Sequence, residues 1–209
     1  CLRNKQFDEA LDLVEEGIVL AEAMDASHDL EHWEEYRLRI ARKRGRKVDI
    51  LRWAEYNVLH HYFNMNTFKL LKKYTSSEKW PAKREELIGK LLEKDRFFRQ
   101  NHLLDVYAVE GMHGRLLELL DHKRTTLGTL DEYAPYLLRD HLDEIVDLYL
   151  PRIYYFVAHN MGRKNYQIAA DYLRQLHDWG ASKQARKLTQ RLREEFSNRP
   201  AMLEEFKGL

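Results

Sequence analysis

The sequence predicts an all-α protein built from packed amphipathic helices. Nine glycines and four prolines in 209 residues are too few for the frequent turns of a sandwich or barrel of short strands. Charged residues make up 33% of the chain and hydrophobic residues 44%, a composition typical of helices with one apolar face. Apolar residues recur at helical spacing, and no run alternates as a strand would.

The N-terminal third predicts three helices. A polar break at residues 25–27 follows the first of them. The second spans residues 29–43 and ends before Gly45, with an inward face at Leu30, Trp33, Tyr36 and Ile40. The apolar stripe of the first helix comprises Phe7, Ala10, Leu11, Val14, Ile18 and Ala21. The third helix spans residues 48–63, with its stripe at Leu51, Ala54, Val58 and Tyr62.

The middle of the chain predicts shorter helices. Residues 64–66 form a connection before a helix over residues 67–74. Ser77 is expected to cap the next helix, which tolerates Pro81 in its first turn. The helix after it ends before Gly111, and a leucine-rich helix over residues 115–121 follows. The apolar positions of the two longer helices are Leu87, Ile88, Leu91, Leu92, Leu103, Leu104, Tyr107 and Ala108.

The C-terminal part predicts the clearest helices. Gly128 precedes a helix with Pro135 near its start, and residues 142–161 form a long apolar helix with a kink at Pro151. Two striped helices follow, ending at Gly180 and near residues 198–200, before a short tail helix over residues 201–206. Their stripes are Tyr166, Ala169, Ala170, Leu173 and Leu176, then Ala181, Ala185, Leu188, Leu192 and Phe196.

The spacing of three glycines indicates an internal repeat. Gly45, Gly111 and Gly180 each end a predicted helix and lie 66 and 69 residues apart, about twice a period of 33–35. A period near 34 with two helices per unit is typical of tetratricopeptide repeats, although their full consensus is absent here. We therefore predict an α-α superhelix of degenerate tetratricopeptide-like repeats over residues 1–209, and a subdivision near residues 64–77 stays open. The alternative is an irregular helical bundle.

The C-terminal residues also carry a family resemblance. The residues that carry this resemblance are Asn165, Tyr166, residues 169–173, Leu176, Gly180, Ala185, Leu192 and residues 198–206. This tail resembles the C-terminal end of bacterial SWIM zinc-finger proteins, in which tetratricopeptide-like helices follow a zinc finger. The resemblance implies binding of DNA or protein through that finger.

The chain departs from that family in its ligands for zinc. The SWIM finger needs Cys-x-Cys followed by Cys-x-His, whereas this chain has a single cysteine, Cys1. The finger is therefore expected upstream, in a longer protein from which this segment comes. One cysteine also permits no internal disulfide, which suits a reducing, cytoplasmic setting. The sequence contains no stretch of 18 apolar residues, so it predicts no membrane span.

Motifs for catalysis are few. His28, Glu31 and His32 match the His-x-x-Glu-His pattern of some zinc proteases, but a third ligand is missing, and we favour a capped helix start as their explanation. Nucleophile-elbow and phosphate-loop motifs are absent. His61 and His102 lack ligand spacing and are expected at the surface, as is the acidic pair Glu34–Glu35. We predict no enzyme activity, no cofactor and no resident metal.

Two basic zones define the alternative function. Net charge is only +1, so the whole protein has no field that attracts nucleic acid. Locally, however, positive charges concentrate at Arg42, Lys43, Arg44, Arg46 and Lys47, and again at Lys183, Arg186 and Lys187. We favour a solvated helix end as the explanation of the first zone. The alternative is that the two zones together bind the phosphates of a nucleic acid.

The main functional prediction is a protein-interaction scaffold. Helical repeats bind an extended segment or a helix on their concave face. Tyr149, Tyr154, Tyr155 and Phe156 form an aromatic cluster that we assign to packing between helices, with ligand stacking as the alternative. The predicted partner is a protein or peptide, and a nucleic acid is the alternative.

Overall fold

The computed structural model describes residues 6–61, 63–94, 96–122 and 125–209. In these residues the chain forms twelve helices and no strand, which confirms the all-α class. They are α1 (Phe7–Ala23), α2 (Ser27–Arg44), α3 (Lys47–His60), α4 (Met65–Tyr74), α5 (Trp80–Leu92), α6 (Arg96–Val109), α7 (His113–Leu120), α8 (Leu127–Leu137), α9 (Leu142–His159), α10 (Arg163–Asp178), α11 (Ser182–Glu195) and α12 (Pro200–Glu205). Cys1 and Tyr62 lie outside the described residues. No helix within them is long and apolar enough to cross a bilayer.

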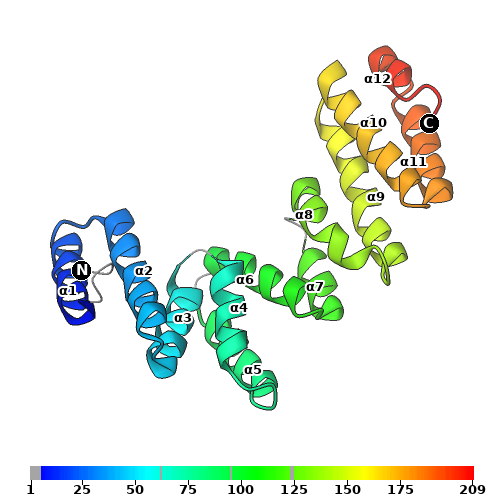
Figure 1. Ribbon diagram of the computed structural model, residues 1–209. Coiled ribbons are helices and arrows are strands. Elements are labelled where there is room, and N and C mark those ends of the chain that lie inside the picture. The colour runs from blue at the N-terminus through cyan, green and yellow to red at the C-terminus, as the bar shows by residue number, and fades with distance from the viewer. Residues whose placement is uncertain (1–5, 62, 95, 123–124) are drawn as a thin grey trace. The chain divides into compact units, whose positions relative to one another are not determined.

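The chain divides into two compact units, Cys1–Asp105 and Val106–Leu209, and the boundary falls within α6. In the first unit α1 packs against α2, α2 against α3, and α3 against both α4 and α5. Figure 1 shows α1 and α2 side by side. Their shared core comprises Ala10, Val14, Ile18 and Ile40. The predicted stripe of the first helix is therefore its buried face.

A glycine sets how closely α1 and α2 approach. A Cβ atom at Gly17 of α1 would lie 2.4 Å from two ring atoms of Trp33 in α2, well inside van der Waals contact. Beside this contact, Arg37 of α2 donates through Nε to Glu15 Oε1 of α1 at 2.8 Å. The indole thus occupies space that a side chain on α1 would otherwise fill.

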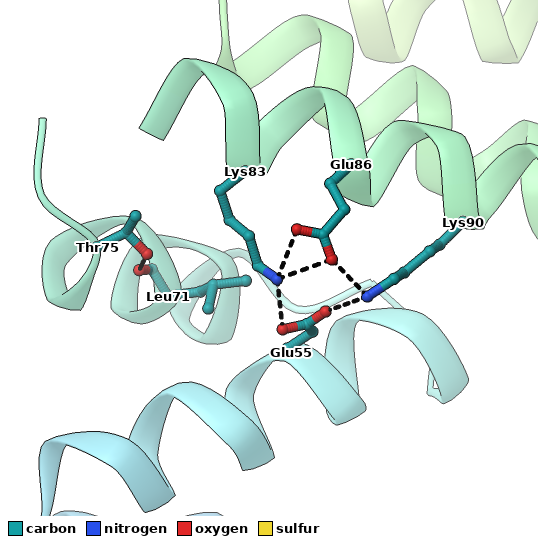
Figure 2. A network of polar contacts seen from close by, with 6 residues as sticks. All are labelled: Glu55, Leu71, Thr75, Lys83, Glu86 and Lys90. Carbon is teal, nitrogen blue, oxygen red and sulfur yellow. Dashed lines mark hydrogen bonds and ion pairs between the residues drawn. The ribbon is translucent and has the colours of Figure 1, made fainter. Parts of the chain in front are cut away.

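An ion-pair network joins α3 to α5 (Figure 2). Glu55 of α3 accepts from Lys83 Nζ at 2.7 Å and from Lys90 Nζ at 2.6 Å, both on α5. Glu86 lies between the two lysines on α5 and contacts each ammonium. On the adjacent α4, the Thr75 hydroxyl donates to Leu71 O at 2.9 Å near the end of that helix. Four charges of two helices are therefore mutually compensated.

The second unit is built around α9 and α10. Helix α9 packs against α7, α8, α10 and α11, and α10 packs against α11 and α12. In Figure 1 α9, α10 and α11 lie side by side. The buried faces of α10 and α11 include the predicted stripe residues Tyr166, Ala169, Leu173, Ala185 and Leu192. Period-3.6 patterning thus located this core correctly.

The predicted helix ends at glycines are confirmed. Gly45, Gly111 and Gly180 have φ angles of 70°, 64° and 94°, a left-handed conformation that favours glycine. At Gly111 and Gly180 the next residue's N–H bonds back into the helix: Met112 N to Tyr107 O and Ala181 N to Leu176 O, each at 2.9 Å. These are Schellman motifs, in which the left-handed residue after the helix is usually glycine, so these glycines mark helix ends in the sequence.

Three local predictions were wrong. Ser77 does not cap α5, because Lys79 precedes the helix and Trp80 N donates to Ser76 O instead. Pro135 lies near the end of α8, whose first residue is Leu127 and whose cap is the Thr126 side chain. Tyr36 is 37% exposed rather than inward. Ile40 is buried as predicted, and the other buried residues of α2 are Glu34, Leu38 and Ala41.

Candidate functional site

The second unit contains an apolar groove. It has a volume of about 820 Å³ and lies among α8, α9, α10 and the segment before α8. We call it the α8–α10 groove, and its principal lining residues are Thr125, Arg152, Tyr155, Phe156, Ile168 and Tyr172. Its size falls in the range of pockets that bury a small ligand or a few side chains of a peptide.

Arg152 fixes one wall of the groove. Its Nη2 donates to Leu120 O at 3.0 Å and to His122 O at 3.1 Å, and its Nε donates to Thr125 O at 3.0 Å. The Nη1 atom donates to Leu148 O on its own helix at 2.7 Å. Burial lowers the pKa of Arg152 from its usual value, but an arginine stays charged at neutral pH. One guanidinium therefore satisfies the carbonyls at the end of α7 and ties them to α9.

A second polar network holds the opposite wall. Asp131 of α8 accepts hydrogen bonds from Tyr149 OH at 2.7 Å, Tyr172 OH at 3.1 Å and Gln175 Nε2 at 3.0 Å. Burial, together with the negative charge of Asp131, raises the pKa of Tyr172 to about 12. The phenol therefore stays protonated and donates throughout the physiological range. Three helices meet at this one carboxylate.

The groove presents both apolar and polar contacts to a ligand. Tyr155 is 62% exposed, and its ring stacks on His159 with the centroids 3.8 Å apart. Thr125 is 7% exposed, and its hydroxyl has no hydrogen-bond partner within the described chain. A buried polar group without a partner is costly, so a ligand group bonded to this hydroxyl would be favoured.

The four aromatic residues that were predicted to pack between helices have different environments in the structure. Tyr149 is fully buried, as predicted, and Tyr154 is half-buried with its hydroxyl donating to Glu195. Tyr155 and Phe156, in contrast, line the α8–α10 groove. Pro151 belongs to the same rim and lies inside α9. Packing therefore describes only part of the cluster.

A polar cluster lies between α2 and α3 in the first unit. Glu34 is 8% exposed and accepts hydrogen bonds from Tyr56 OH and from His61 Nε2, the latter at 3.0 Å. His102 is also buried, and its Nε2 lies 2.6 Å from His61 O. Burial and the bond to Glu34 raise the pKa of Tyr56 to about 12.

Two predictions about these residues were wrong. His61 and His102 were expected at the surface, and Glu34 in an exposed stretch, yet all three side chains are buried. A signal for Glu34 was available, because it lies midway between Leu30 and Leu38 at helical spacing. The spacing of His61 also indicated burial, because this residue directly follows α3 and continues the helical spacing of the buried Ala54 and Val58. Charge alone was a poor guide to burial here.

The first basic zone lies at the turn between α2 and α3. Arg42 and Lys43 are exposed in the last turn of α2, and Arg44 pairs with Asp8 at 2.7 Å. Arg46 and Lys47 are also exposed, and Arg46 Nε lies 3.2 Å from Asp49 Oδ2.

The second basic zone occupies one side of α11, where Lys183, Arg186 and Lys187 are exposed. The two zones belong to different units. The histidine motif is also on the surface: His28 Nε2 and His32 Nε2 are 3.2 Å apart, in the first turns of α2. No group of three or more metal-binding side chains occurs among the described residues.

Comparisons of this chain with protein-family models, with curated proteins and with solved structures found no match.

Proposed function

We propose that this chain is a non-enzymatic protein-interaction scaffold that binds an extended segment of a partner protein in the α8–α10 groove. The observation that carries the proposal is the make-up of the groove: the exposed ring of Tyr155 and the half-buried Phe156 and Ile168 lie beside the buried Thr125 hydroxyl, which has no partner among the described residues. Peptide-binding grooves combine apolar pockets for side chains with a few polar groups that fix the backbone.

The walls of the groove support binding by a rigid surface. Arg152 holds one wall through backbone carbonyls, and Asp131 holds the other through Tyr172. Preorganised walls reduce the entropy lost when a partner binds. Tyr155 offers a large area with only two side-chain torsions to immobilise, which makes it the expected energetic centre.

The proposal includes the repeat architecture. We assign α8 with α9, and α10 with α11, as two tetratricopeptide-like hairpins of an α-α superhelix. The first helices of these pairs begin at Leu127 and Arg163, 36 residues apart, close to the tetratricopeptide period. Packing of α9 against both helices of the next pair supports this assignment.

We also propose that the chain derives from the C-terminal region of a bacterial SWIM zinc-finger protein acting in the cytoplasm. The resemblance in residues 165–206 supports this origin. Sequencing the region upstream of Cys1 in the source gene tests it. A Cys-x-Cys motif followed by Cys-x-His would support the assignment, and an upstream region without it would overturn it.

A peptide selection tests the binding function. Random peptides of about 12 residues displayed on phage are selected on the full chain, and the affinity of the best peptide is measured by fluorescence anisotropy. We expect Tyr155→Ala to weaken binding by about 30-fold, the effect of losing a central aromatic anchor. Tyr136→Ala is the matched control, because Tyr136 is 41% exposed on α8 outside the groove lining. Equal affinities of both variants would contradict the proposal.

Nucleic-acid binding is the second candidate, because Lys183, Arg186 and Lys187 form an exposed basic side of α11. Salt distinguishes the two functions. Between about 50 and 200 mM salt, binding through several phosphates falls by orders of magnitude, whereas an apolar groove is nearly insensitive. Binding of an oligothymidylate that shows this steep loss, and that Lys183→Gln with Lys187→Gln weakens, would favour the second candidate.

A further inference from the structure

A polar cleft opens among α2, α3 and α4 in the first unit. Its inner pocket has a volume of about 150 Å³ and is lined by Glu31, Glu35, Asn57, His61, Asn64 and Thr67. An outer recess of about 520 Å³ shares Glu35, Asn57, Asn64 and Thr67 with it, so the two are continuous. The outer recess adds two cations, Arg39 and Arg42. The cleft is therefore acidic at its inner end and basic at its mouth.

Two buried side-chain atoms without a hydrogen-bond partner among the described residues belong to residues that line the inner pocket. Asn57 is 7% exposed, and its Oδ1 has no hydrogen-bond partner in the described structure. His61 is 8% exposed; its Nε2 bonds to Glu34, and its Nδ1 has no hydrogen-bond partner among the described residues. The nearest carboxylate oxygen to this Nδ1 is Glu31 Oε1, at 3.4 Å. The inner pocket therefore combines a buried amide oxygen without a donor with acidic side chains at its wall.

We propose that the inner pocket binds the primary ammonium group of a small ligand. An ammonium has three N–H donors and no acceptor, which suits three acceptors of the lining: Asn57 Oδ1 and the carboxylates of Glu31 and Glu35. Its positive charge is compensated by Glu31 and Glu35 at the pocket wall. A guanidinium is planar, with five donors in a fixed fork, and fits these three acceptors less well.

The mouth of the cleft defines the other end of the ligand. Arg39 and Arg42 line the outer recess and are exposed on α2. A carboxylate is the complement of such a pair, whereas a second ammonium there would be repelled. The ligand class is therefore an ω-amino acid, with its ammonium group in the inner pocket and its carboxylate at the mouth.

A series of matched probes tests this assignment on the full chain. The probes are 5-aminopentanoate, pentanoate, 1,5-diaminopentane and 5-guanidinopentanoate, and binding is followed by calorimetry and by backbone amide chemical shifts. We expect saturable one-site binding of 5-aminopentanoate, with shifts at Glu31, Asn57 and His61, and weaker binding of the other three. Affinity for pentanoate equal to that for 5-aminopentanoate would overturn the proposal, as would absence of binding by every amine in the series.

Substitutions in the cleft provide a second test of the binding site. Glu35→Gln changes an exposed side chain and keeps the helix surface, so the fold should be retained. It should weaken 5-aminopentanoate binding by about tenfold, because a charged acceptor is lost. Asn57→Leu should abolish binding, and circular dichroism checks that this variant is folded. Glu16→Gln on α1 is the control and should bind as the wild type does. Unchanged affinity in Glu35→Gln and in a folded Asn57→Leu would refute the site.

Discussion

Single residues decide how the helices of the first unit approach. Gly17 allows the Trp33 ring to lie against the backbone of α1, at a distance that excludes a Cβ atom. Glycine inside a helix normally destabilises it by about 1 kcal/mol relative to alanine. Its presence at position 17 is therefore explained by close packing of the indole rather than by the helix itself.

Gly17→Ala should destabilise the protein. The new methyl group must displace the indole ring, and overpacking of this kind costs about 1–3 kcal/mol, more than the gain in helix propensity. Gly89→Ala is the matched control, because Gly89 lies exposed in α5 with nothing near a Cβ atom, and it should stabilise by about 0.5–1 kcal/mol. Thermal unfolding followed by circular dichroism measures both. A rise in melting temperature for both variants would contradict this account.

Residue identities predicted burial well where the residue was apolar. Ala10, Val14 and Leu176 were assigned to the core and are buried there. Glu34 and His61 were not, because the cost of burying them is offset by partners on another helix, Tyr56 and each other. Sequence periodicity reports which face of a helix is buried, but it does not report which polar groups will meet across two helices.

At the scale of elements, charge holds α3 and α5 together. Glu55 forms ion pairs with both Lys83 and Lys90, and the three side chains are partly shielded from solvent. Burial by itself raises the pKa of Glu55, but the hydrogen bonds and charges of the two lysines outweigh it and lower the pKa below its usual 4.5. Folding therefore favours the ionised carboxylate.

Glu55→Gln should lower stability in a manner that depends on pH. A carboxyl whose pKa is lowered by folding contributes stability above its unfolded pKa, and this contribution is lost as the pH falls through the folded value. At neutral pH the variant should be less stable by about 1 kcal/mol, as for other partly exposed ion pairs. The deficit should shrink toward about pH 3. Urea unfolding at both pH values measures it, with Glu16→Gln as control, and a deficit independent of pH would refute the ion-pair explanation.

Helix ends were predicted unevenly, for a physical reason. Ends at Gly45, Gly111 and Gly180 were located correctly because a left-handed residue almost requires glycine there. Helix α1 ends at Ala23, and the left-handed residue after it is Asp25, with a φ of 52°; here a polar break, and no glycine, marks the end in the sequence. The start of α5 was misassigned because many residues, including Lys79, can precede a helix without a side-chain cap.

At the scale of the whole molecule, the chain is two units, each with its own core. The sequence predicted one continuous array and left open a division near residues 64–77, whereas the units divide between Asp105 and Val106. Residues 64–77 lie within the first unit, where α4 packs against α3. Repeats contact mainly their sequence neighbours, so the pattern of stripes identifies helices without revealing where one compact unit ends.

Residues 96–209 should fold without the preceding residues. This fragment keeps α6 whole and contains the second unit with its buried residues, among them Leu130, Tyr149 and Leu192. We expect a helical circular dichroism spectrum, a cooperative thermal transition and retained binding of the peptide selected on the full chain. A fragment that is unfolded at 20 °C would show that the second unit depends on the first.

The most direct test of the central claim locates a bound peptide on the protein. The selected peptide is titrated into ¹⁵N-labelled full chain, and amide chemical-shift changes are mapped along the sequence. The account predicts that the changes concentrate at Thr125–Gly128, Arg152–Asn160 and Ile168–Tyr172, the segments that line the α8–α10 groove. Changes confined to α11 around Lys183 and Lys187, or to the turn around Arg42 and Lys47, would contradict it.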